Sequence, residues 1–184
     1  MQKVKVHGSE AGITMIETLM AAFILVIGSV AMIGLIISSI ASNNRNKIDS
    51  TQTMLTEAIL EQINSAYIQA SCVSLGGGCA DMTDCAGTKW TINTAAGGAA
   101  LNGSSIDFTQ TSPPTNYSMN YVVSNPCTPT GAVQGVYDVR WNVSQIGTTN
   151  TYLLTVSARL KGHGEGNLYF SLPVTLRLLT GSGA

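Results

Sequence analysis

The sequence predicts an α+β protein in which one long N-terminal helix precedes a C-terminal head built on an antiparallel β-sheet. Two observations predict this layout. An uncharged apolar run near the N-terminus continues into a segment with helical periodicity. The last third of the chain contains three segments in which apolar and polar residues alternate, as they do in half-buried strands. We therefore expect a helix with a membrane-spanning half and an amphipathic half, the second of which packs on the sheet.

The apolar run is long enough to cross a membrane. From Thr18 to Ser42 there is no Asp, Glu, Lys, Arg or His. A helix of this length extends roughly 37 Å, compared with about 30 Å for the hydrocarbon core of a bilayer. Glu17 lies at the threshold of this run. A carboxylate at the edge of such a segment is costly unless it meets a partner, so Glu17 is a candidate functional residue, and the alternative is a residue that only marks the membrane interface.

Helical periodicity continues beyond the apolar run. Apolar residues recur there at three- and four-residue steps and line one face of a helix, whereas Glu57 and Glu61 fall on the opposite face. We expect one helix over residues 13–71, with its transmembrane part at about residues 18–42, and an apolar face that packs on the head. That face consists of Ile48, Leu55, Ala58, Ile59, Ile63, Ala66 and Ala70.

The remainder of the chain, residues 72–184, is expected to form a Gly- and Cys-containing loop region followed by the β head. We expect irregular loops over residues 76–116, with short strands near Lys89–Asn93 and Ile106–Thr109. Three alternating segments follow and predict an antiparallel meander, with Pro173 favouring an edge position or a bulge for the last strand. The apolar positions are Tyr137, Val139, Trp141 and Val143, then Leu154, Val156, Ala158 and Leu160, then Leu172, Val174, Leu176 and Leu178.

All four cysteines follow the apolar run. An even count in Gly-rich sequence suits two disulfides in an oxidising compartment. Free buried thiols and a metal site are the alternatives, although the cysteine spacing contains no Cys-x-x-Cys pair. We favour Cys72–Cys79, because Gly76–Gly78 allows a tight loop between them, and Cys85–Cys127.

The composition limits the classes of function. The chain has 184 residues, of which 45% are hydrophobic and 10% charged. The chain contains 9 Lys or Arg and 10 Asp or Glu residues, a formal net charge of −1. This charge is too small to indicate a nucleic-acid partner for the whole molecule. No nucleophile, base and acid form a recognisable set, and His163 lies in a Gly-rich turn. We therefore expect no enzyme activity, no cofactor and no metal.

The N-terminal segment resembles the class III leader of type IV pilins and of type II secretion pseudopilins. In that superfamily a short basic leader ends in Gly, and Glu is the fifth residue after the cleavage site. Here the basic leader is residues 1–12, Gly12 matches the cleavage Gly, Ile13 the new N-terminus and Glu17 the fifth mature residue. Ile13 departs from the pattern, because Phe or Met is commoner there. The resemblance covers roughly the first third of the chain.

The resemblance implies an order of processing and assembly steps. A prepilin peptidase would cut between Gly12 and Ile13, and the Ile13 amine would be methylated. The subunit would be stored in the bacterial inner membrane as a single-pass protein, with its N-terminus cytoplasmic and its head periplasmic. With an assembly platform in that membrane it would join other pilin or pseudopilin subunits, in an extracellular pilus or a periplasmic pseudopilus. Glu17 would meet the N-terminal amine of a neighbouring subunit or its own.

The head is similar to those of PilV-type minor pilins and of the matching minor pseudopilin. Their heads often contain a strand of the pattern Tyr-x-Val-x-Trp followed by two more strands, as Tyr137–Trp141 does here. This similarity implies a minor subunit, with a structural role at or near the filament tip. The residues themselves leave two other functions open, which are an uncleaved signal-anchored protein and a binding module for DNA or a surface. The binding module would use Arg140, Arg159 and Arg177, which we expect to align on the polar side of the sheet.

Overall fold

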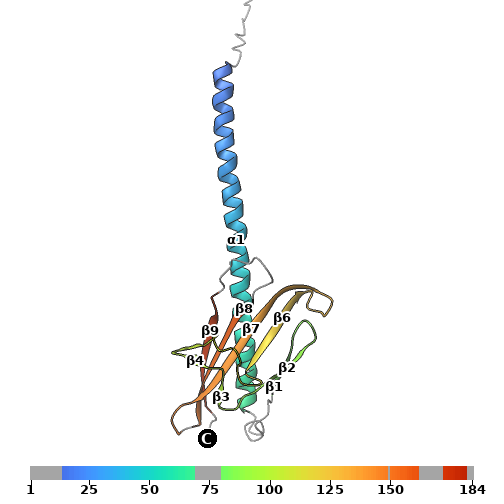
Figure 1. Ribbon diagram of the computed structural model, residues 1–184, viewed down its shortest axis with the longest axis vertical. Helices are drawn as coiled ribbons and strands as arrows, with labels where there is room; N and C mark the ends of the chain where they lie inside the picture. Colours follow the sequence, from blue (N-terminus) through green and yellow to red (C-terminus); the bar gives the residue numbers. More distant parts are fainter. Residues whose placement is uncertain (1–13, 69–79, 149, 162–171, 182–184) are drawn as a thin grey trace, which may run out of the picture. The chain divides into compact units, whose positions relative to one another are not determined.

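The computed structural model describes residues 14–68, 80–148, 150–161 and 172–181, and it contains one long helix followed by an antiparallel β domain (Figure 1). The chain divides into two units, Met1–Asn44 and Arg45–Ala184. The predicted α+β layout is confirmed at this level. Gly12, Ile13, Ala70, Cys72, Cys79 and the predicted Gly-rich turn that contains His163 lie outside the described residues.

The helix α1 spans Met15–Ile68. Thr14 precedes it, and the Thr14 carbonyl accepts the backbone N–H groups of Glu17 at 3.0 Å and of Thr18 at 3.2 Å, which are the first bonds of the helix. The predicted helix over residues 13–71 is therefore confirmed between Met15 and Ile68, and the predicted ends at 13 and 69–71 fall outside the described residues.

Five strands form the main sheet of the head, and four of them make an antiparallel meander in chain order. Consecutive strands β6, β7, β8 and β9 pair with one another, and β3 pairs with the far end of β7 on the same side as β6. Two hairpins, β1–β2 and β4–β5, complete the head. The strands are β1 (Ala80–Thr83), β2 (Lys89–Ile92), β3 (Gly97–Gly98), β4 (Leu101–Asn102), β5 (Ser105–Ile106), β6 (Ser118–Asn125), β7 (Ala132–Gln145), β8 (Thr151–Lys161) and β9 (Val174–Gly181).

The three predicted strands correspond to β7, β8 and β9, and the predicted apolar residues within them share one face. The prediction is wrong for Leu172, which precedes β9 and is 80% exposed. The register pairs Val139 with Ala158 and Trp141 with Val156, so these side chains stand side by side. Together with Leu55, Ile59 and Ile63 of α1 they form one buried cluster, which confirms the predicted packing of the helix stripe on the sheet. Glu57 and Glu61 are exposed on the opposite helix face, as expected.

Polar residues of α1 also enter this interface. Gln52 and Thr56 are fully buried between the apolar positions of the stripe. The Thr56 hydroxyl donates to the carbonyl of Gln52 at 3.0 Å and to that of Thr53 at 2.8 Å. The helix backbone therefore satisfies the hydroxyl, which lets a polar residue occupy a core position that the apolar pattern does not predict.

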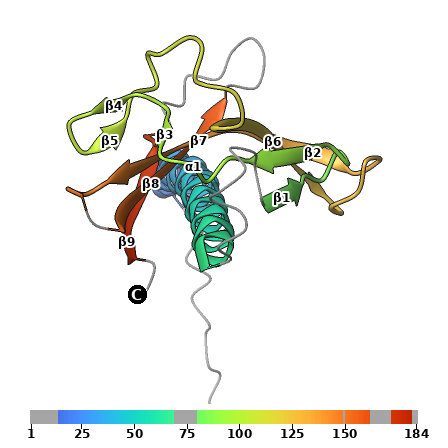
Figure 2. The same cartoon turned by 90° about the horizontal axis from the view of Figure 1, so that it is seen from below.

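The second face of the sheet is covered as well, which differs from the prediction of a half-buried sheet. In Figure 2 the chain between β3 and β6 lies on the side of the sheet opposite α1. The Asn142 amide donates to the Ala99 carbonyl at 2.9 Å and ties this cover to β7. As a result Thr155 and Ser157, on the polar side of β8, are fully buried.

The prediction of a strand at Ile106–Thr109 is wrong for residues 107–109. The strand β5 ends at Ile106, and the Asp107 carboxylate accepts the N–H of Thr109 at 2.8 Å and its hydroxyl at 2.6 Å. These bonds hold the pKa of Asp107 below its ordinary value. A side chain that accepts the backbone two residues ahead makes a turn in place of a strand.

Candidate functional site

The N-terminal candidate, Glu17, lies in the first turn of α1, three residues after Thr14, and its side chain is exposed. The pattern Thr14-x-x-Glu17 also matches a capping box, in which a Glu or Gln at the third helical position accepts from the backbone N–H of the residue before the helix. A carboxylate is favourable there because it faces the positive end of the helix dipole, typically by 0.3–1 kcal/mol. Glu17 therefore has a local structural role available besides the predicted pairing.

The segment after Glu17 exposes apolar side chains on every face of the helix. The large hydrophobic residues between Met15 and Ile40 are 55–84% exposed. The helix is long and apolar enough to be a candidate membrane span near the N-terminus. A helix that is apolar on all faces is expected to be surrounded by lipid or other protein. Burial of each large aliphatic side chain away from water contributes a favourable free energy of about 1.5–3 kcal/mol, which is lost if the helix stays in water.

In the head, one carboxylate holds two arginines on the polar side of the sheet. Asp138 of β7 accepts Arg140 at 2.9 Å and 3.0 Å through its two oxygens, and Arg159 of β8 at 3.0 Å. The side chains of Asp138 and Arg140 are only 9% and 8% exposed, whereas that of Arg159 is 37% exposed. The strand register makes this possible because Asp138 pairs directly with Arg159.

The cover of the second face completes this cluster. Arg140 also donates to the Gln110 backbone carbonyl at 2.7 Å, so its guanidinium binds both Asp138 and the cover. The Phe108 ring lies 4.4 Å from the Arg159 guanidinium carbon and 5.1 Å from that of Arg140. Both separations are within the range of cation–π attraction. Asp138, Arg140, Arg159 and Phe108 are called the arginine cluster below.

The predicted row of three exposed arginines does not form. Arg140 is buried in the arginine cluster. Arg177 of β9 pairs with Thr155 of β8, and Thr155 lies four residues before Arg159, a distance of about 13 Å along the strand. Only Arg159 and Arg177 of the three present accessible charge. The sequence pattern placed the three arginines on the right face but did not reveal Asp138 as the common partner of Arg140 and Arg159. The available signal was the position of Asp138, two residues before Arg140 and so on the same face.

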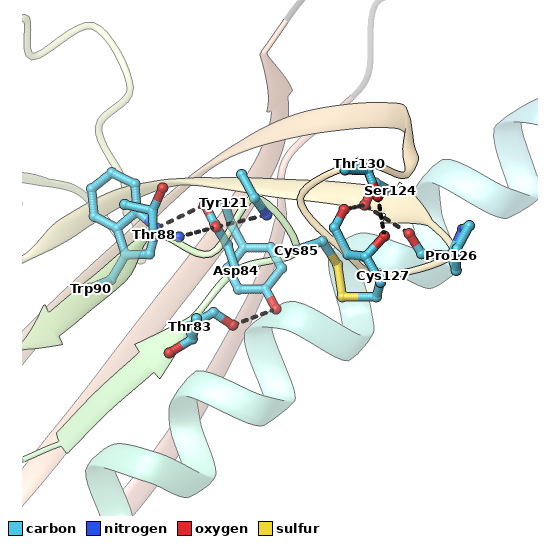
Figure 3. The surroundings of a disulfide bond; sticks show 12 residues. Thr83, Asp84, Cys85, Thr88, Trp90, Tyr121, Ser124, Pro126, Cys127 and Thr130 are labelled. Carbon is cyan, nitrogen blue, oxygen red and sulfur yellow. Dashed lines mark hydrogen bonds between the residues drawn. A yellow bond between two sulfur atoms is a disulfide. The ribbon is translucent and has the colours of Figure 1, made fainter.

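A disulfide joins two turns at one end of the head. Cys85 follows β1 and Cys127 follows β6, and their sulfur atoms are bonded (Figure 3). The predicted pair Cys85–Cys127 is therefore present, and the predicted Cys72–Cys79 pair lies outside the described residues. The backbone supports the bridge, because the Cys85 N–H donates to the Val122 carbonyl of β6 at 3.1 Å.

Side chains around the bridge fix both turns. The buried Asp84 carboxylate accepts the N–H groups of Ala86 and Thr88 and, at 3.1 Å, the indole N–H of Trp90 (Figure 3). Tyr121 reaches the Thr83 carbonyl, and burial raises the pKa of its hydroxyl. These contacts assign Asp84 a structural role, since both of its oxygens are occupied within the protein.

Breaking the Cys85–Cys127 bridge is expected to destabilise the head. The bridge closes a loop with a sequence separation of 42, and its loss by Cys85→Ala with Cys127→Ala should lower the free energy of unfolding by about 2–4 kcal/mol. Urea unfolding of the full chain in detergent measures this. Alkylation of the folded wild-type protein without reductant should leave both thiols unlabelled, and labelling of both would contradict the bridge.

Within the described ranges, no group of three or more His, Cys, Asp or Glu side chains lies close enough together to hold a metal ion. Both histidines, His7 and His163, fall outside those ranges. In comparisons with known proteins, no family model, no curated protein and no solved structure matches this chain.

Proposed function

We propose that this chain is a minor structural subunit of a type IV pilus or type II secretion filament. The observation that carries the proposal is Glu17 in the first turn of a helix whose following 25 residues contain no charge and whose large apolar side chains are exposed on every face. Such a helix suits two successive environments. Lipid surrounds it while the subunit is stored, and the helices of other subunits surround it in the filament.

The Glu17 carboxylate at the edge of the apolar segment would have the Ile13 amine as its partner. Cleavage after Gly12 creates an amine on Ile13, which is cationic near neutral pH, four residues from Glu17. A buried pair of opposite charges adds little net stability, but leaving one partner alone costs roughly 3–5 kcal/mol. Glu17 therefore acts as a register device, because only a docked subunit with a free N-terminus satisfies it.

The head is the part that the filament displays, in this proposal. Both faces of its sheet are covered and the Cys85–Cys127 bridge joins two of its turns, which suits a domain in an oxidising compartment. The inner membrane, a prepilin peptidase, an assembly platform and neighbouring subunits are the partners implied.

Processing at Gly12 tests the proposal and separates it from an uncleaved membrane-anchored protein. In cells with a prepilin peptidase, the intact mass of the membrane-extracted chain should correspond to Ile13–Ala184, with one methyl group if the amine is modified. In otherwise identical cells without the peptidase the mass should correspond to a chain that retains residues 1–12. A chain that keeps its leader in both strains would support the signal-anchored alternative.

A further inference from the structure

A concave surface on the head lies beside the arginine cluster. It encloses about 410 Å³, which is within the range of small-molecule sites. Residues of β2, of the cover between β5 and β6, and of β6, β7 and β8 line it. We call this surface the polar hollow, and its lining includes Trp90, Phe108, Gln110, Asn120, Arg159 and Lys161.

The polar hollow carries an excess of positive charge. Among the described residues that line it, Arg140, Arg159 and Lys161 supply three cations and Asp138 supplies one carboxylate. Arg140 and Asp138 are buried and neutralise one another, so the two outer cations remain as the net charge. Lys161 is exposed, and its ammonium donates to the Asn120 side-chain oxygen at 3.1 Å. A hollow with two accessible cations attracts an anionic group.

The outer cations are held in place before any ligand arrives. Asp138 binds Arg159 through Nε and Nη2, and the Phe108 ring lies against the same guanidinium. Asn120 of β6 accepts a hydrogen bond from Lys161 of β8 across the intervening strand β7. Ordered donors lose less conformational entropy on binding, which favours affinity for a small ligand.

The rest of the lining suits a hydroxyl-rich ligand. The lining contains amide and hydroxyl side chains besides the two aromatic residues Trp90 and Phe108. Amides and hydroxyls both donate and accept hydrogen bonds, so they match sugar hydroxyl groups, whereas the cations match a carboxylate. The polar members of this lining are Thr109, Gln110, Thr111, Ser118 and Asn120.

We propose that the polar hollow binds a carboxylate-bearing sugar, such as a uronic acid unit of an acidic oligosaccharide. Arg159 and Lys161 would pair with the carboxylate, and the amides and hydroxyls would bind the ring hydroxyls. Duplex DNA fits less well, because two cations in a concave site neutralise few phosphates and Arg177 lies outside the hollow. The inference does not depend on filament assembly.

Titration of the full chain in neutral detergent with digalacturonate tests the proposal. Tryptophan fluorescence is a suitable readout, because Trp90 lines the hollow whereas Trp141, the only other tryptophan, is fully buried. We expect saturable binding with a dissociation constant on the order of 1 mM or below, and no saturation with the neutral disaccharide galactobiose. Lys161→Gln should raise the dissociation constant about tenfold, because it removes a charge-assisted hydrogen bond from an exposed position.

Arg177→Gln is the matched control, since Arg177 is an exposed arginine on the same side of the sheet but outside the hollow. It should leave the dissociation constant unchanged. Absence of digalacturonate binding, equal binding of galactobiose, or equal affinity of wild type and Lys161→Gln would overturn the proposal. A 12-base-pair DNA duplex that binds more tightly than digalacturonate and loses affinity with Arg177→Gln would overturn it in favour of an extended cationic face.

Discussion

Glu17→Val is expected to remove the protein from sheared filaments while leaving it cleaved and resident in the membrane. In the proposed filament the Ile13 amine would then be buried without a partner, at a cost of roughly 3–5 kcal/mol. Because 1.4 kcal/mol corresponds to a factor of ten in an equilibrium, incorporation should fall about 100-fold or more. Co-purification with sheared filaments measures incorporation, and intact mass of the membrane fraction verifies cleavage.

The geometry of the helix start supplies the control for this experiment. Glu17 also matches the third helical position of a capping box, where Gln serves as well as Glu. Glu17→Gln therefore preserves the cap but removes the charge. If the charge is required, Gln fails as Val does. Normal incorporation of Glu17→Gln together with failure of Glu17→Val would show that Glu17 acts through the helix cap, and normal incorporation of both would leave it without a role in assembly.

Asp138→Ala is expected to destabilise the head strongly, although it removes a polar side chain from outside the apolar core. It leaves Arg140 buried without its counter-charge and removes the partner of Arg159. Breaking a buried pair in this way costs roughly 3–5 kcal/mol. For a domain of this size the loss corresponds to a fall in Tm of roughly 10 °C or more. Thermal unfolding of the full chain, followed by near-ultraviolet circular dichroism, measures the change.

Asp81→Ala is the matched control, because it removes the same side chain from an exposed ion pair. Asp81 binds Lys89 at 2.7 Å, but the two side chains are 42% and 69% exposed. Lys89 lowers the pKa of Asp81 through their hydrogen bond, yet exposed pairs typically contribute at most about 1 kcal/mol. Equal effects of the two substitutions would contradict the buried role assigned to Asp138.

The elements that could be predicted from the sequence are those in which buried apolar residues repeat at the regular spacing of a helix or a strand. Leu55, Ile59 and Ile63 repeat every turn, and Tyr137 to Val143 alternate, because each set faces one core. The strand β6 was not predicted. Its buried residues Met119 and Tyr121 also alternate with polar neighbours, but Val122 and Val123 break the pattern where the strand register shifts.

The arginine cluster could not be predicted from local patterns, because it depends on a long-range cover. An Asp and two Arg residues on the polar side of a sheet normally face solvent, and nothing near Asp138 in the sequence indicates that residues 99–111 return over that side. Gly98 makes this return possible. Its φ is +131°, and a Cβ there would lie 2.5 Å from the Trp141 carbonyl oxygen, so only glycine allows β3 to approach β7 this closely.

The most direct test of the filament assignment compares where the wild-type protein is found, in filaments or in the membrane, in matched cells with and without a prepilin peptidase. Filaments are sheared, and the chain is quantified and its N-terminus identified by mass spectrometry in the sheared and membrane fractions. The account predicts a chain beginning at Ile13 in the filaments of cells with the peptidase, and a chain retained in the membrane with its leader in cells without it. A chain that stays in the membrane fraction of both strains and never enters filaments would contradict the account.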